Sequence, residues 1–139
     1  MATKSQTILD RVLAVLTGTL PGTPPVYDDR VDAFDRDEGV ANILITPESE
    51  ETEPFDNVNE LSTLYINIEI DIRANAWKAA ADVIAAAMHP LLMNDAALNA
   101  MVIRIRRNAK KWEAHEADIT AGVLTLQYRV LYLLPPSQI

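Results

Sequence analysis

The segment from residue 64 to residue 73 alternates between apolar and polar side chains, and this alternation constrains the fold more than any other feature of the chain. Because successive side chains of a β-strand point to opposite faces, the pattern predicts a strand with one buried face. A packed layer must cover the apolar row. That row consists of Leu64, Ile66, Ile68, Ile70 and Ile72.

Two segments have the apolar spacing of amphipathic helices. The first helix is predicted over residues 5–17, where Thr3 and Gln6 have the form of a capping box and Gly18 suits the residue that closes a helix. The second helix is predicted over residues 77–92. Both are long enough to cover part of a sheet.

Polar residues and a proline mark the ends of the second helix. Asn75 is a candidate cap for its start, and Pro90 is expected to limit or kink it. Asn94 or Asp95 is expected to start one more helical turn.

Several further segments have the composition of strands. Pro47 is expected to end one of them, and the charged stretch after Arg106 reads as a hairpin connection, with a short strand around Trp112 as an alternative. The predicted strands are residues 26–31, 41–46, 61–74, 101–106 and 122–134. The last of these places Leu124, Leu126, Tyr128, Val130 and Tyr132 on one face.

Residues 48–60 are rich in acidic side chains and poor in apolar ones, and we predict a mobile loop there. The fold class expected for the whole chain, residues 1–139 as a single domain, is α+β: one mostly antiparallel, mixed sheet of four to five strands with two main helices packed on one face. The other face would then show Leu131 and Leu133, whose exposure would indicate a contact surface.

Charge and composition exclude some classes of function. A formal net charge of -8 argues against a protein whose main task is to bind nucleic acid phosphates. Cysteine is absent, which excludes disulfides and thiolate chemistry in this chain. No run approaches the roughly twenty apolar residues of a membrane span, so we expect a soluble protein made in the cytoplasm with no membrane partner.

Two acidic clusters raise the question of a metal site. Residues 28–38 hold several carboxylates that could serve a small metal-dependent enzyme, because Mg²⁺ sites and acid–base catalysis both use paired carboxylates. His115 lies among acidic residues, but its spacing matches no helical zinc motif. No nucleophile elbow, phosphate-binding loop or metalloprotease helix accompanies either cluster, so solvated turns are the favoured interpretation.

The main basic concentration lies in residues 104–111. We interpret it as a match for an acidic neighbour, and in a homo-oligomer that neighbour could be residues 48–60 of the next subunit. Its members are Arg104, Arg106, Arg107, Lys110 and Lys111.

The order of elements resembles the tail terminator proteins of long-tailed bacteriophages, similar to minor tail protein U. The resemblance depends on the helix ILDRVLAVL, the acidic segment before the alternating strand LYINIEIDIRA, the helix WKAAADVIAAAMHPLL and the closing strand GVLTLQYRVLY. It implies a non-enzymatic virion protein that needs no cofactor and no metal. Such a protein forms a six-membered ring on the head-proximal end of the tail tube, stops polymerisation and offers a surface to head-completion proteins.

The resemblance also implies partners and a location. The partners are further copies of the chain, the tail tube protein and a head-completion or connector protein, with DNA as non-specific cargo in the lumen. The location is the neck region of the virion tail, after assembly in the host cytoplasm. The expected contact residues are Glu48, Glu50, Glu51, Glu53, Glu69, Asp71, Arg73, Arg104, Arg106, Arg107, Lys110, Lys111, Leu131 and Leu133.

Three alternatives stay open at this point. Another neck protein that joins portal to tail would also form a ring of subunits. A metal-dependent enzyme using residues 28–38 belongs to a different class, and so does a monomeric binding module of a host protein.

Overall fold

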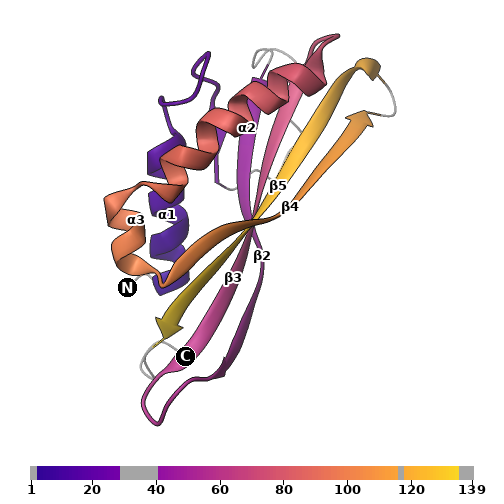
Figure 1. The fold of residues 1–139 in the computed structure, drawn as a ribbon. Helices are drawn as coiled ribbons and strands as arrows, with labels where there is room; N and C mark the ends of the chain where they lie inside the picture. Colours follow the sequence, from indigo (N-terminus) through magenta and orange to yellow (C-terminus); the bar gives the residue numbers. More distant parts are fainter. Residues whose placement is uncertain (1–2, 29–40, 116–117, 135–139) are drawn as a thin grey trace.

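A computed structural model describes residues 3–28, 41–115 and 118–134 (Figure 1). Its strands form one sheet in the order β1-β2-β3-β5-β4. Strands β1 and β2 are parallel and all other neighbours are antiparallel, as the expected mixed α+β fold requires. The elements in chain order are α1 (Lys4–Leu16), β1 (Val26–Tyr27), β2 (Ala41–Pro54), β3 (Glu60–Arg73), α2 (Trp77–Met93), α3 (Ala96–Met101), β4 (Arg104–His115) and β5 (Asp118–Leu134).

The core lies between the sheet and a layer of helices on one of its faces (Figure 1). The alternating row predicted in β3 is buried, with Ile68 and Ile70 fully inaccessible to solvent, and the matching row of β5 is buried beside it. We name the covered side the helix face. The opposite side, which presents residues such as Asn67, Thr125 and Gln127, is the open face.

Helix α1 has the expected N-cap at Thr3 and the expected glycine after its end, but only part of the predicted capping box. The hydroxyl of Thr3 accepts a hydrogen bond from the backbone N–H of Gln6 at 3.2 Å. The side chain of Gln6 bonds to Asp10 at 2.8 Å, so only half of the predicted capping box forms. Gly18 has a φ of 76°, the left-handed conformation that glycine adopts readily after a helix.

The predicted cap of α2 was wrong, whereas the helical turn after it is confirmed. Ala76 occupies the N-cap position without a side-chain hydrogen bond, so Asn75 does not cap the helix. Pro90 lies inside α2, which ends only at Met93, and the carbonyl of Pro90 bonds to the N–H of Asn94 at 3.0 Å. Asp95 caps α3 by accepting from the N–H of Leu98 at 2.9 Å.

Strand β2 corrects the largest error of the sequence analysis. Pro47 does not end it, and the segment predicted as a mobile acidic loop is a strand as far as Pro54. A register shift between Pro47 and Ser49 accommodates the proline, and pairing with β3 then continues to Glu60. An outer strand exposed on both sides needs no apolar row, because backbone hydrogen bonds to its neighbour hold it in place.

The other edge of the sheet also differs from the prediction. Strand β4 begins at Arg104 instead of residue 101, and the stretch expected to be a hairpin connection continues as a strand to His115. Strand β1 is confirmed for Val26–Tyr27. The strand does not continue to Asp28, and residues 29–31 of the predicted strand lie outside the described residues.

Candidate functional site

The two outer strands of the sheet offer the clearest candidate contact surfaces. β1 pairs with β2 only at Ile43 and Leu44, so no described strand lies beyond residues 47–54. Strand β4 is outermost on the other side. We name residues 47–54 the acidic edge and residues 104–111 the basic edge.

The side chains of the acidic edge divide between the two faces. Glu51 and Glu53 lie opposite Thr63 and Leu61 on the open face and are exposed. Glu48 accepts a hydrogen bond from the amide of Gln127 across that same face.

Glu50 points to the other side of the acidic edge. It accepts a hydrogen bond at 2.8 Å from the hydroxyl of Ser62, which is buried. Within the described residues, Glu51 and Glu53 have no ion-pair partner, so they are the carboxylates most available to a second molecule.

The alternation of β4 divides the predicted basic cluster. Arg104, Arg106 and Lys111 pair with open-face positions of β5, whereas Arg107 and Lys110 pair with the buried residues Tyr128 and Leu126 and therefore lie on the helix side. A register shift between Arg107 and Ala109 produces this division.

Lys110 of the basic cluster already has an ion-pair partner within the chain. The Lys110 ammonium lies 2.8 Å from a carboxylate oxygen of Asp82 on α2 and 4.7 Å from the ring centre of Trp112. Arg104, Arg106 and Lys111 are exposed and have no ion-pair partner among the described residues. The open-face members are therefore the better contact candidates.

One row across the open face has an acidic side chain at one end and a basic side chain at the other. This row runs from Glu51 through Thr63 and Leu131 to Arg104. The next row ends with Arg106 directly opposite Arg129. Like charges in direct register are unfavourable on a sheet surface, so an anion placed near these guanidinium groups would be stabilising.

A hollow of about 340 Å³ lies on the open face beside the acidic edge. Glu51, Glu53, Tyr65 and Arg129 are among the residues that line it. Acidic and basic side chains both line this hollow, so we interpret it as a polar depression of the surface and not as an enclosed ligand site.

The remaining predicted contact residues lie away from both edges. Glu69 and Asp71 lie near the end of β3, the middle strand of the sheet, and Asp71 is buried. Burial together with the charges of Asp71 and Glu113 raises the pKa of Glu69. Arg73 ends the same strand. Leu131 and Leu133 are half-buried, so the exposed apolar pair expected on the open face is less accessible than the sequence indicated.

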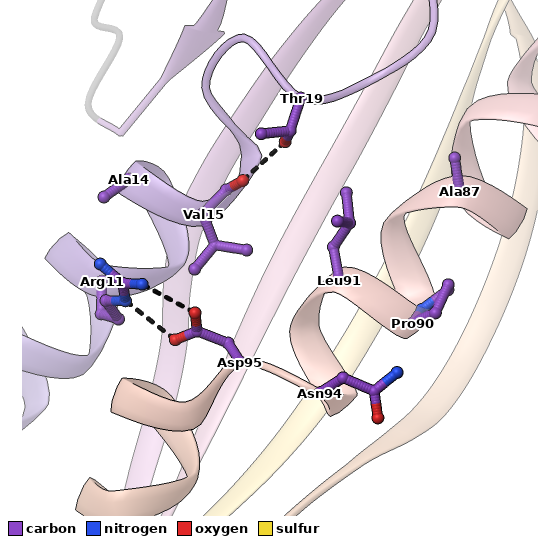
Figure 2. A pocket seen from close by; sticks show the side chains of 9 residues that line it. All are labelled: Arg11, Ala14, Val15, Thr19, Ala87, Pro90, Leu91, Asn94 and Asp95. Atoms are coloured by element: carbon purple, nitrogen blue, oxygen red, sulfur yellow. Dashed lines mark hydrogen bonds and ion pairs between the residues drawn. The ribbon is translucent and has the colours of Figure 1, made fainter.

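A groove of about 560 Å³ lies in the helical layer, between α1 and α2, and Figure 2 shows the side chains that line it. Val15, Leu91 and Pro90 contribute apolar walls. The charged pair at its end is internal, since Arg11 donates to both carboxylate oxygens of Asp95, at 2.7 and 2.8 Å. This groove offers no unpaired charge for chemistry.

The Arg11–Asp95 contact predicts a specific dependence of stability on pH. The hydrogen bond from Arg11 lowers the pKa of Asp95 to about 2, so its contribution to stability is complete above the ordinary value of 3.8 and is lost as pH falls towards 2. Asp95→Asn keeps a capping side chain and removes the charge. We expect a fall of a few degrees in the unfolding temperature at pH 7 and a much smaller difference from the parent protein near pH 2, measured by circular dichroism. An equal difference at both pH values would contradict this.

Sequence reasoning missed one polar pair between the helices and the sheet. Nδ1 of His89 lies 3.0 Å from the hydroxyl oxygen of Tyr128. Burial, with the nearby charge of Arg107, lowers the pKa of His89, and burial raises the pKa of Tyr128 to about 12. The signal was present, because Tyr128 lies in the predicted buried row and its hydroxyl needs a partner.

The described residues contain no group of three or more His, Asp or Glu side chains that could hold a metal ion. Of the acidic cluster at residues 28–38, only Asp28 is described, and it is exposed; the side chain of His115 is not described. No helix within residues 3–28, 41–115 and 118–134 has the length and apolarity needed to cross a membrane.

Comparisons with known proteins support the fold. No protein-family model matches the chain, and no curated protein matches it either. Among solved structures, the chain is similar to a chain of the "Virion of native gene transfer agent (GTA) particle", with a TM-score of 0.58 and 20% sequence identity. The match covers 95% of this chain and 92% of that chain, so the two share an α+β fold over almost their whole lengths.

Proposed function

We propose that this protein is a structural component of a phage-like virion, and that it forms a ring that caps the head-proximal end of the tail tube. The observation that carries the proposal is the pair of oppositely charged outer strands on one sheet. The shared fold with a chain of a gene transfer agent virion supports a virion location.

A ring of identical subunits needs two different, complementary surfaces on each subunit. The acidic edge and the basic edge meet this requirement, because they lie on opposite sides of the sheet and carry opposite charges. Six subunits are expected from the resemblance to tail terminators. The role is structural, and no residue is assigned to catalysis.

The acidic residues of β3 on the open face do not take part in the proposed contact between the edges. Glu69 and Asp71 are too far from either edge to join an edge contact, so any contact role for them requires a partner that covers the open face. With a net charge of -8, the chain also suits a channel through which DNA passes without binding.

The turn between β2 and β3 is the candidate surface for a neighbour along the tail. It lies beyond the helical layer, at one end of the sheet (Figure 1). Phe55 and Val58 are 56% and 62% exposed there. The turn is preformed, because the carboxylate of Asp56 accepts from the backbone N–H groups of Val58 and Asn59, at 2.7 and 2.6 Å.

Replacing Phe55→Ser and Val58→Ser together tests this joining surface. Because both side chains are largely exposed, we expect the free energy of unfolding to change by less than about 0.5 kcal/mol. Ring formation should persist while binding to tail tubes, measured by co-sedimentation, falls at least about tenfold. Undiminished co-sedimentation would remove the turn from the joining surface.

The proposed capping role is tested with the tail tube protein of the same virus. Added to polymerising tubes, the protein should stop growth and appear as a density at one end of each tube in electron micrographs. Unaffected tube growth, with binding to portal or head-completion proteins instead, would indicate another neck protein. Binding to none of these would contradict the assembly role.

A further inference from the structure

We propose that neighbouring copies of this chain join by strand addition, with the acidic edge of one subunit pairing antiparallel to the basic edge of the next, so that the sheets continue from subunit to subunit. The partner is therefore a second copy of the chain. This inference rests on the proposed ring and specifies its contact. Both edges retain backbone N–H and C=O groups that no described strand engages on the outer side.

The strand directions within the sheet fit this contact. β2 is antiparallel to β3, β3 to β5, and β5 to β4, so β2 and β4 run in opposite directions. Rotation about a ring axis that lies roughly along the strands leaves the direction of each strand unchanged. The acidic edge of one copy therefore meets the basic edge of the next copy antiparallel, as in the rest of this sheet.

The positions of the charged residues along the two edges also fit this contact. Glu51 and Arg104 end one row of the sheet, and Ser49 and Arg106 end the next. When two copies are placed side by side without a shift along the strands, Glu51 meets Arg104. The pairing of residues 49–54 with β3 and of residues 104–107 with β5 has no register shift, so each offers a regular ladder.

The faces of the sheet match in the same arrangement. Rotation about the ring axis keeps the open face of one copy continuous with the open face of the next. Glu51 then lies opposite Arg104 and diagonal to Arg106 on the same face, and Glu53 lies diagonal to Arg104, so ion pairs can form across the contact. Arg106 and Arg129, which have like charges and lie opposite each other, would then have a carboxylate of the neighbouring copy close by.

The charges also select against the other pairings that exposed strands can make. Two acidic edges or two basic edges would bring like charges together, which disfavours symmetric dimers. Only the unlike combination is attractive, and it leaves one free edge at each end of a growing chain. Such a contact generates a closed ring or an open filament.

Cysteine cross-linking tests the contact, because the chain has no cysteine of its own. Ser49→Cys and Ala109→Cys place thiols on the open-face side of the two edges at exposed positions, and they keep every charge. The proteins are concentrated until they assemble and are then treated with a short bis-maleimide. Denaturing electrophoresis shows which chains have become joined.

Strand addition predicts that each single variant stays monomeric on the gel, whereas the double variant gives a ladder up to the size of the ring. Hydrogen exchange should show slower exchange at residues 49–54 and 104–113 on assembly. Covalent dimers from either single variant would overturn the unlike pairing. Rings that form with no ladder and with unprotected edges would overturn strand addition and leave the ring intact, whereas absence of any assembly would overturn both.

Discussion

Reversing two charges on the basic edge, with Arg104→Glu and Arg106→Glu, should abolish assembly while leaving the subunit folded. Both side chains are exposed and have no ion-pair partner among the described residues, so the fold does not depend on them. At the contact, each reversal replaces an attraction to a carboxylate with a repulsion. Like-charge contacts cost several kcal/mol, so we expect at least about a hundredfold weaker association, measured by analytical ultracentrifugation.

Two further variants make this test specific. Lys78→Glu changes the charge by the same amount as Arg106→Glu, but on an exposed position of α2, and should leave association unchanged. Adding Glu51→Arg and Glu53→Arg to the reversed protein exchanges the signs of the two edges and should restore assembly. Assembly of the reversed protein at the concentration that suffices for the parent would contradict the edge contact.

Gly122→Ala should produce a large loss of folding stability without any direct effect on an interface. Gly122 lies in β5 under the indole of Trp77, the first residue of α2. A Cβ atom built on Gly122 would lie 2.3 Å from Cε2 of Trp77, a distance that real contacts do not reach. The ring is rigid and buried, so the helix must move, and we expect a loss of about 3 kcal/mol in urea-induced unfolding.

A double-mutant cycle separates this clash from any destabilising effect of alanine at position 122 that does not involve Trp77. In a Trp77→Leu background the smaller side chain leaves room for the methyl group, so Gly122→Ala should cost at least about 1 kcal/mol less. Equal costs in both backgrounds would show that the close approach of Trp77 is not the cause.

The sequence predicts those parts of the fold in which a single face is buried. The apolar rows of β3 and β5 and the stripe of α1 follow directly from their periodicity, because only burial makes that pattern favourable. The acidic part of β2 has no such row, since it lies at an edge, and its strand conformation comes from pairing with β3. A prediction based on composition therefore assigned it to a loop.

The sequence predicts the charges of the candidate site but not its geometry. The sequence identifies both charged segments and their complementarity. It does not show that both are outer strands of one sheet, because that depends on the strand order. The register shift between Arg107 and Ala109 has no sequence signal of its own, yet it decides that Lys111 lies on the open face and Lys110 beside Asp82.

The most direct test of the proposed function is the mass of the protein in solution, measured by light scattering over a range of protein and salt concentrations, with and without tail tubes. A discrete species of about six subunits that appears as a ring in negative stain, and that weakens as salt screens the charged edges, is the expected result. A protein that stays monomeric under all these conditions, including in the presence of tube ends, would contradict the account.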